Sequence, residues 1–347
     1  MTGTPDLSVV VCSYNRADRL SGTLHALERQ TIRERLEIVI VDDGSMPSID
    51  EREVGRSGAK LLRHPANRGP AAARNTGAAA SLAPIVAFTD DDCRPAPEWA
   101  SSLLSAYNDP QVGAAGGPVV GSGQTGCLER YFICKQPFGP LEATLGRSSS
   151  LTYRFWLYAR ENIAPQLHVG ERDAYLLAGA NLSFRREVFD ALGGFDGRIR
   201  TGEDGDICYR LHQKFPNSSI RLIPNAVVEH DYDIRLRDVL RRAMGYGEGN
   251  ARNHAKHDNW GPTIYPAPVL WTLALLIGPR RRRWSLPALA LPLLFSPRWF
   301  VQALRARSAE PLAYAYLQIL QEGASNAGFA SGWWRARRQK VSPGRAS

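Results

Sequence analysis

The sequence predicts an α/β protein with a mixed, mostly parallel sheet flanked by helices and with a C-terminal helical extension. Short apolar runs rich in β-branched residues alternate with segments of helical period near the N-terminus, which is typical of a parallel sheet with helical crossovers. Those apolar runs end in polar or acidic residues, and the chain becomes basic and apolar after residue 235. With 347 residues, 44% of them hydrophobic and 22% charged, the chain can bury one large core or two smaller ones.

The N-terminal segment supplies the clearest strand and helix signals. Residues 7–14 are an apolar run that predicts a buried strand, and Leu20, Leu24 and Leu27 repeat at helical spacing within residues 18–29. Strand character returns at residues 36–41, before an Asp-Asp-Gly-Ser turn. The further elements expected here are a strand at 59–63, an alanine-rich helix at 70–80 and a strand at 85–88.

The middle of the chain is less regular. Residues 121–171 are interrupted by Gly and Ser and show no clean period, so we interpret them as loop and irregular helix that shape a second substrate site. Regular patterns resume with a strand predicted at 176–185, a helix at 204–215 and a strand at 220–230.

Charge is concentrated in the C-terminal part. The formal net charge is +9, and residues 235–347 carry 18 Lys+Arg against 5 Asp+Glu, whereas residues 1–234 carry 25 against 29. A basic helix is predicted at 235–257, and the apolar runs 269–278 and 284–295 flank Arg280–Arg283. Each run is shorter than the roughly 20 residues that cross a bilayer as a helix.

Two interpretations of this C-terminal extension stay open. Short Trp- and Leu-rich helices bracketed by arginines suit an anionic membrane interface. The alternative is a helical subdomain packed on the catalytic core, or a dimer contact. The arginine run Arg280–Arg283 favours the interface, because a buried subdomain does not explain it. The oligomeric state is left unpredicted.

The cysteines and the N-terminus indicate a compartment. Five cysteines are scattered without the spacing of a zinc or redox motif, which favours a reducing cytosol. The first residues show no basic segment followed by a signal-length apolar stretch, so no export signal is expected. The expected location is the cytoplasm, peripheral at the cytoplasmic face of the membrane.

The strongest local signal for chemistry is the acidic run Asp90, Asp91 and Asp92 at the exit of a predicted strand. Hard cations such as Mg²⁺ and Mn²⁺ take oxygen ligands, and a diphosphate leaving group needs its charge neutralised. The alternative is a solvated acidic turn or a helix cap.

Two further polar clusters follow predicted strands. Asp42 and Asp43 enter a tight glycine turn, where carboxylates can accept hydrogen bonds from a nucleoside, although Asp-Gly turns are common. Residues 67–77 form a glycine turn that leads into a small-residue helix, from which Arg74 and Asn75 are expected to face the crevice. A packed alanine helix with a surface arginine is the alternative. Together with Ser13, Tyr14 and Asn15, these clusters converge on one edge of the sheet.

The ordered set of motifs resembles family 2 glycosyltransferases with the GT-A fold. The resemblance covers roughly residues 7–232. Its donor half, within residues 1–115, rests on Val9–Arg16, Val41–Ser45, Asn67–Gly77 and Phe88–Asp92. Its acceptor half, within residues 116–234, rests on Gly179–Phe189, Leu192–Asp196 and Gly202–Asp206, and residues 235–347 form the extension.

The resemblance implies a role for each matching residue. Asp42 and Asp43 match the acids that hold the nucleoside, and Asp92, supported by Asp90, matches the metal-binding pair for Mn²⁺ or Mg²⁺, with Asp91 as a spacer. His230 completes the metal shell in some relatives. The other donor-binding candidates are Ser13, Tyr14, Asn15, Arg16, Arg68, Gly69, Arg74, Asn75 and Asp91, and the acceptor-binding candidates are Gly179, Ala180 and Asn181.

The pair Glu203-Asp204 matches the family's catalytic acids, with Asp204 as the general base. Inversion at the anomeric carbon needs a base opposite the leaving diphosphate, to take a proton from the attacking hydroxyl. Glu203, Asp204 and Asp206 also suit an N-terminal cap of the helix that follows, and the two roles are compatible. Arg241 and Arg242 are weaker candidates for diphosphate contacts.

The expected function is therefore inverting transfer of a sugar from a nucleotide-diphosphate sugar, with UDP favoured, to a glycan, lipid-linked or other hydroxyl acceptor. Because the Gln-x-x-Arg-Trp signature of processive relatives does not occur near residues 235–250, a single addition is expected. A catalytically inactive nucleotide-sugar or glycan binding protein is the alternative, which the intact acids disfavour. Nucleic-acid binding is not supported, because the sequence shows no stacking aromatics organised on a sheet and no recognisable reading helix. Nicotinamide chemistry is not supported, because the first strand leads into Ser-Tyr-Asn-Arg rather than a glycine-rich phosphate turn.

Overall fold

The computed structural model describes residues 4–123, 126–135, 150–163, 170–232, 235–258, 260–277 and 285–341, which form two compact units. The first unit holds the described residues 4–123 and 170–232 together with Lys135. The second holds 126–134, 150–163 and 235–341. The helices between residues 126 and 163 thus group with the C-terminal helices, so the two units are not divided at a single point near residue 234.

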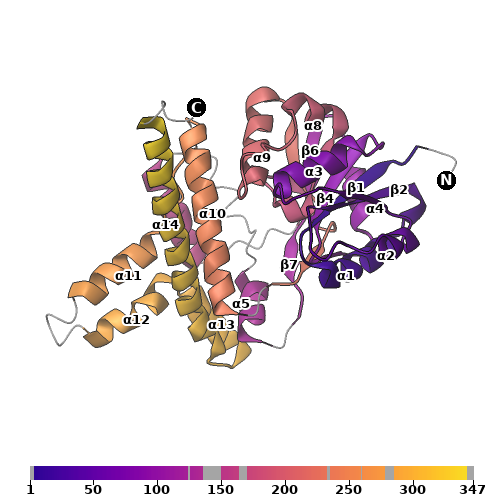
Figure 1. Cartoon of the computed structure of the whole chain (residues 1–347). Coiled ribbons are helices and arrows are strands. Elements are labelled where there is room, and N and C mark those ends of the chain that lie inside the picture. The colour runs from indigo at the N-terminus through magenta and orange to yellow at the C-terminus, as the bar shows by residue number, and fades with distance from the viewer. Residues whose placement is uncertain are drawn as a thin grey trace. The chain divides into compact units, whose positions relative to one another are not determined.

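The first unit is built on a mixed sheet that helices cover on both faces (Figure 1). Its strand order among the described residues is β3-β2-β1-β4-β9-β6-β10-β8. The first four strands run parallel, β9 is antiparallel to β4 and β6, β10 is parallel to β6, and β8 is antiparallel to β10. The bounds are β1 Leu7–Ser13, β2 Leu36–Asp42, β3 Lys60–Arg63, β4 Ile85–Asp90, β6 Val112–Gly116, β8 Arg172–Asp173, β9 Leu182–Arg185 and β10 Ser219–Leu222.

Alternation along the central strands explains the two helical layers. Val9 and Val11 of β1 face a cluster with the leucines of α1, whereas Val10 between them faces the alanines of α3. Side chains one residue apart point to opposite faces of a sheet, so an all-apolar strand is buried on both. The helices on the first face are α1 Ala17–Glu28, α2 Glu51–Arg56 and α4 Trp99–Ala106, and those on the second are α3 Pro70–Ala79, α8 Arg186–Leu192 and α9 Glu203–Lys214.

The alanine-rich helix α3 packs unusually close to the sheet. A Cβ atom added to Gly77 would lie 2.3 Å from a methyl carbon of Val10 and 3.1 Å from one of Val41. Only glycine therefore fits at this point, and a larger residue would push α3 away from β1 and β2. The position of Arg74, one helical turn earlier, depends on this approach.

A second, small sheet has the order β5-β11-β7. Its strands are β5 Cys93–Pro95, β7 Val119–Gly121 and β11 Val228–His230, with β11 antiparallel to β5 and parallel to β7. The sequence predicted one strand over 220–230, and the structure corrects this. A turn in which the Ala226 amide donates to the Ile223 carbonyl separates β10 from β11, and Pro224 at that turn cannot continue the ladder.

The second unit is helical. Its elements are α5 Cys127–Lys135, α7 Leu151–Ile163, α10 Leu236–Lys256, α11 Pro266–Ile277, α12 Ser285–Phe295, α13 Arg298–Ala306 and α14 Glu310–Val341. Helices α10 and α14 lie side by side (Figure 1), and their backbones are in close contact at Gly247 and Gly328. A Cβ added to either glycine would lie 2.0 Å or less from a carbonyl oxygen of the other helix. Regular helices α5 and α7 stand where loop and irregular helix were predicted. Among the described residues, no helix combines the length and apolar character that crossing a bilayer requires.

Candidate functional site

The candidate site begins at the carboxyl ends of the central parallel strands. In the register of the sheet, Ser13 of β1 pairs with Asp42 of β2, and Cys12 pairs with Asp90 of β4. The predicted strand-end clusters therefore lie at one edge of the sheet, as expected for a ligand crevice in an α/β fold.

Arg74 connects the acidic run to the start of α9. One guanidinium nitrogen donates to Asp90 at 2.8 Å, and the other donates to Glu203 at 2.5 Å. The Arg74 and Glu203 side chains are almost fully buried, whereas about a third of the Asp90 side chain, 31%, is exposed. This double ion pair places Glu203 and its neighbour Asp204 close to the acidic run, although the two lie more than a hundred residues apart in the sequence.

Asp91 contacts other side chains, those of Ser13 and Arg16. It is buried, and its carboxylate accepts a hydrogen bond from the Ser13 hydroxyl at 2.7 Å. Burial raises the pKa of Asp91 to about 7, against the lowering effect of the Ser13 hydrogen bond.

The two oxygens of the Asp92 carboxylate contact different partners. Its Oδ2 atom lies 2.8 Å from a guanidinium nitrogen of Arg16 and 3.5 Å from one of Arg19. Its Oδ1 atom lies 3.4 Å from Nε2 of His230 and 3.9 Å from Sγ of Cys93. Asp92 thus presents one oxygen to cations of the protein and the other to two side chains of types that can bind divalent metals.

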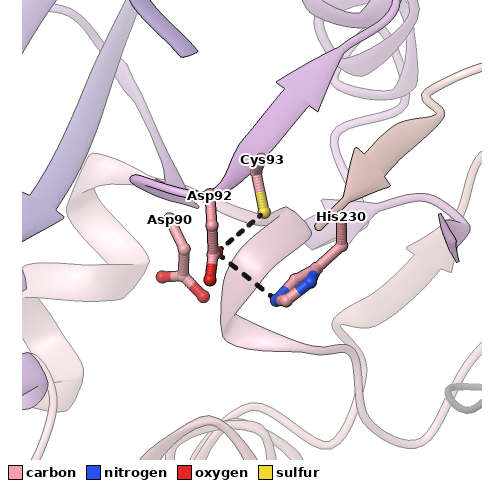
Figure 2. A group of neighbouring side chains, drawn as sticks. All are labelled: Asp90, Asp92, Cys93 and His230. Carbon is pink, nitrogen blue, oxygen red and sulfur yellow. Dashed lines mark hydrogen bonds and ion pairs between the residues drawn. The ribbon is translucent and has the colours of Figure 1, made fainter. Parts of the chain in front are cut away.

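Figure 2 shows the group that results. The potential ligand atoms of Asp90, Asp92, Cys93 and His230 all lie within 4.8 Å of one another. Carboxylate oxygen, imidazole nitrogen and thiol sulfur are all donors for divalent metals. The donor set and its compactness therefore fit a metal ion.

The small sheet delivers His230 to this group. His230 pairs with Cys93 across β11 and β5, and the Asp231 amide donates to the Asp92 carbonyl at 2.9 Å. Arg94, which points the other way from Cys93, makes two hydrogen bonds to the Asp231 carboxylate at 3.0 and 2.7 Å. The acidic run and the histidine are thus fixed together by backbone pairing and an ion pair.

The carboxylate of Asp42 holds a turn. It accepts hydrogen bonds from the backbone amides of Ser45 and Ile49 at 2.8 and 3.2 Å, and from Arg63 at 3.2 Å. Burial raises the pKa of Asp42, but the hydrogen bonds from Ser45, Ile49 and Arg63 outweigh it and hold that pKa below its usual range.

Asp43 holds the next turn along the crevice. It accepts from the amides of Arg68 and Gly69 at 2.9 and 2.8 Å, and one oxygen lies 2.7 Å from Nδ1 of His64. The other ring nitrogen of His64 lies 2.9 Å from the Thr76 hydroxyl. Gly69 takes a positive φ of 90° immediately before α3, so a residue with a side chain would be strained there.

The loop after β1 is fixed to the Asp42 turn. The Asn15 amide donates to Ser45 Oγ, and the Asn15 side chain accepts from the Met46 amide, each near 2.9 Å. Asn15 has a positive φ of 54°, and the neighbouring Tyr14 side chain is 44% exposed. Tyr14 therefore offers an accessible aromatic face beside the nucleoside candidates.

Asp204 lies at the first turn of α9 and contacts Gly179, one of the predicted acceptor residues. Its two oxygens accept from the amides of Gly179 and Gly205 at 3.0 and 2.7 Å. Glu203 is more buried, and burial raises its pKa to about 7 against the opposing charge of Arg74. Asp206 is fully buried and paired with Arg210 within α9, so it serves the helix.

Two predicted ligand-binding side chains are engaged inside the protein. The Asn75 amide exchanges two hydrogen bonds with the Phe195 backbone. Asn181 is fully buried, accepts from the Trp99 indole and donates to the carbonyls of Pro118 and Ala226. Gly179 lies against Arg74, whose guanidinium would be 3.1 Å from an added Cβ, and Ala180 is buried next to it. Arg241 and Arg242 lie on α10, in the second unit.

Sequence reasoning did not single out Cys93, Arg19 or His64. The sequence positions of two of them could have indicated the site. Cys93 directly follows the acidic run, and His64 lies at the carboxyl end of β3, just as Asp42 lies at the carboxyl end of β2. Arg19 is one turn into α1 and carries no sequence signature of its contact with Asp92.

The chain belongs to glycosyltransferase family 2. The family model "Glycosyl transferase family 2" matches residues 8–193, more than half of the chain. The mixed sheet with its helices and the likeness to a solved glycosyltransferase described below give it the GT-A fold.

Among curated proteins, a pre-mycofactocin glycosyltransferase from Mycobacterium tuberculosis (strain ATCC 25618 / H37Rv) is 29% identical over 282 residues, covering 78% of this chain and 52% of that protein. A glucosyl-dolichyl phosphate glucuronosyltransferase from Haloferax volcanii is 32% identical over 215 residues, which is 60% of each. The chain thus spans about half the length of the first relative.

Among solved structures, the mannosyltransferase PcManGT from Pyrobaculum calidifontis, in complex with GDP-Man and Mn²⁺, has a TM-score of 0.53 and 21% identity. The match covers 96% of this chain and 88% of that one. This likeness concerns the fold.

Proposed function

We propose that this protein transfers a single sugar from a nucleotide-diphosphate sugar to an acceptor hydroxyl, with inversion at the anomeric carbon. The observation that supports this most is the Asp90-Arg74-Glu203 connection, which joins the candidate metal-binding group to the first turn of α9, where Asp204 lies. Asp90, Asp92 and His230 hold Mn²⁺ or Mg²⁺ in this proposal. The metal, when bound, neutralises charge on the diphosphate as it leaves.

Asp204 is the general base of the proposal. The amides of Gly179 and Gly205 orient its carboxylate, and an oxygen so fixed can accept the proton of the attacking hydroxyl. The acceptor is expected along Gly179 and Ala180. Asn181, whose side chain is buried, supports this segment from the core in our proposal rather than touching the acceptor.

The nucleoside end lies over the two turns that Asp42 and Asp43 hold. Ser13, Tyr14, Asn15, Arg68 and Gly69 surround these turns, so the exposed Tyr14 face and the backbone of the turns contact the base and ribose in our proposal. Arg16 contacts Asp92 and is available to a phosphate when the metal replaces it there.

UDP is the donor nucleotide we favour. The relative from Haloferax volcanii is named for transfer to a lipid phosphate sugar, and the structural neighbour was solved with GDP-Man. Because of the first name, a lipid-linked glycan is the acceptor class to test first. Because of the second, GDP-sugars belong in the donor panel beside UDP-sugars.

The test is release of nucleotide from a panel of UDP- and GDP-sugars, with Mn²⁺, Mg²⁺ or chelator, followed by transfer to lipid-linked and free glycans. We expect metal-dependent turnover with one nucleotide, and Asp204→Asn should remove transfer while leaving donor binding nearly unchanged. Donor binding without turnover under every condition would instead support the inactive binding protein.

The second unit supplies a surface for a membrane in our proposal. Helices α11 and α12 contain no charged residue, and their side chains Leu270, Leu273, Leu276, Leu289 and Leu294 are between 45% and 71% exposed. With α7 they line an apolar cavity of about 170 Å³.

The charge of the C-terminal residues supports an anionic bilayer as the occupant of this leucine surface in our proposal. Residues 235–347 carry 18 basic and 5 acidic side chains, and Arg280–Arg283, which lie outside the described residues, fall between the two helices in the sequence. Anionic lipid attracts such a segment, whereas a second copy of the same basic chain repels it.

Vesicle flotation tests this placement. The protein should float with vesicles that contain anionic lipid, and the double variant Leu273→Glu/Leu276→Glu should not. Leu82→Glu, the same change at a 71% exposed leucine of the first unit, is the matched control and should still float. Self-association that the double variant abolishes, without vesicle binding by the unaltered chain, would make the surface a dimer contact.

A further inference from the structure

The structure adds a sulfur donor to the metal centre, and we infer that Cys93 is a metal ligand that shifts the preference of the site from Mg²⁺ towards thiophilic cations. This inference rests on the proposed metal centre of Asp90, Asp92 and His230. It goes beyond that centre by assigning a fourth side chain and a metal selectivity.

The geometry of Asp92 carries the first step. Its Oδ2 atom is taken by Arg16 and Arg19, whereas Oδ1 lies on the side of His230 Nε2, at 3.4 Å, and Cys93 Sγ, at 3.9 Å. An oxygen, a nitrogen and a sulfur thus converge on the side of the carboxylate that the arginines leave open (Figure 2). Their spread of at most 4.8 Å matches ligands that each lie about 2.0–2.6 Å from one ion.

The direction of Cys93 is fixed by the small sheet. Cys93 pairs directly with His230 across antiparallel strands, so both side chains lie on the same face. The next residue, Arg94, pairs with Asp231 on the opposite side. The Thr23 hydroxyl holds the backbone by hydrogen bonds to the carbonyls of Asp91 and Cys93, at 2.9 and 2.7 Å.

The alternative role of Cys93 is packing. Its side chain is fully buried and borders the apolar cluster under α1 and α4, where a cysteine behaves as a small hydrophobe. Packing alone does not require the sulfur to face a carboxylate and an imidazole. An alanine or valine would fill an apolar corner equally well. A measurement that detects a bond between the sulfur and the metal therefore distinguishes ligation from packing.

Ligation by Cys93 has a defined chemical consequence. The S–H bond breaks, its proton passes to solvent, and the sulfur electron pair forms the bond to the metal. Mg²⁺ selects oxygen ligands, whereas Co²⁺, Zn²⁺ and Cd²⁺ accept sulfur. The protein should therefore bind these cations more tightly, relative to Mg²⁺, than a site made of carboxylates and imidazole alone.

The test is the absorption spectrum of the full chain titrated with Co²⁺, with Mn²⁺ as competitor. A sulfur-to-cobalt charge-transfer band should appear in the unaltered protein and in Cys12→Ser, the matched control on β1, whose sulfur is outside the candidate metal-binding group. Cys93→Ser should lose the band and weaken Co²⁺ binding by about tenfold, as ligand-shell changes do. Its Mg²⁺ affinity should be unchanged or higher, because serine replaces sulfur with oxygen.

The outcomes separate this inference from the proposed function. Co²⁺ that binds in competition with Mn²⁺ but gives no sulfur band in the unaltered protein overturns the role of Cys93 and leaves the metal centre intact. A chain that binds no divalent cation overturns both. The unaltered protein gives this answer by itself, so the test stands even where a Cys93 variant fails to fold.

Discussion

Two acidic pairs follow parallel strands of the same sheet, and the structure uses them differently. The carboxylates of Asp42 and Asp43 accept hydrogen bonds mainly from backbone amides of the turns that they close. The carboxylates of Asp90 and Asp92 face arginine side chains, a histidine and a cysteine. In our proposal the first pair shapes the crevice, and the second presents charge to a ligand. An acid bonded to amides stabilises the fold, whereas Asp92, which is paired with the partly exposed Arg16, can exchange that cation for a metal in our proposal.

The largest effect on this comparison is expected from Arg74→Ala. The change leaves Asp90 and Glu203 without the buried cation that both contact, which should cost about 3–5 kcal/mol in the free energy of unfolding. Urea denaturation measures it. Arg74→Lys keeps the charge but loses the two-pronged contact, so an intermediate loss is expected. A variant as stable as the unaltered chain would show that this connection is not needed.

Asp92→Asn should separate chemistry from stability. The amide cannot supply the anionic oxygen that faces His230 and Cys93, so metal-dependent turnover should fall on the order of 100-fold or more. Its unfolding free energy should change little, because the Arg16 side chain is 46% exposed and water can solvate its charge when this partner is lost. Initial rates at saturating Mn²⁺, together with urea denaturation, give both numbers. Equal turnover would remove Asp92 from the site.

Asp42→Asn should show the opposite pattern. The variant weakens charge-assisted hydrogen bonds to Ser45, Ile49 and Arg63 and should lose about 2 kcal/mol of stability at pH 7. Its metal affinity should stay within a fewfold of that of the unaltered chain. A variant that loses metal binding but keeps its stability would reverse the comparison.

The pH dependence of stability follows from the same carboxyl. Because the pKa of Asp42 is lower in the folded than in the unfolded protein, its ionised form stabilises the fold above the unfolded pKa of about 3.9. That contribution is lost as the pH falls through the folded pKa. The stability difference between the unaltered chain and Asp42→Asn should therefore be full at neutral pH and shrink below about pH 4. A difference that stays constant down to acid pH would contradict the assignment.

The smallest effect is expected from Gly179→Ala. An added Cβ would lie 3.1 Å from the Arg74 guanidinium, which can yield by a few tenths of an ångström. Stability should drop by about 1 kcal/mol or less, in the range of mild overpacking. Acceptor KM should rise more than donor KM, since Gly179 orients Asp204. An equal change in both would place Gly179 outside the acceptor edge.

Local patterns were enough to predict much of the first unit. Strands β1, β2 and β4 are continuous apolar runs because both faces are covered, and α3 carries small residues because it packs on Val10. The acids at the strand ends were visible because polar residues interrupt such runs. The predicted strands at 7–14, 36–41, 59–63 and 85–88, the predicted helices at 18–29, 70–80 and 204–215, and the family are confirmed. The strand predicted at 176–185 is shorter than expected, because a 3₁₀ helix at Gly179–Asn181 precedes β9.

Contacts between distant segments could not be predicted in the same way. Cys93 and His230 meet through strands of three residues, too short to show a period, and the strand predicted at 220–230 is split by a turn at Pro224. Helix α7 exposes the aromatic side chains of Tyr153, Phe155 and Trp156 among polar residues. The apolar residues of 151–163 therefore show no clear helical period in the sequence. The roles of the site residues stay predictions until variants are measured.

Mn²⁺ binding by Asp92→Asn and Asp42→Asn, compared in one calorimetric titration with the unaltered chain, tests the central claim most directly. We expect Asp42→Asn to bind Mn²⁺ with nearly unaltered affinity, whereas Asp92→Asn loses most of that affinity. Equal Mn²⁺ affinity in the two variants, whether lost or kept in both, would contradict the separate roles assigned to the two acidic pairs.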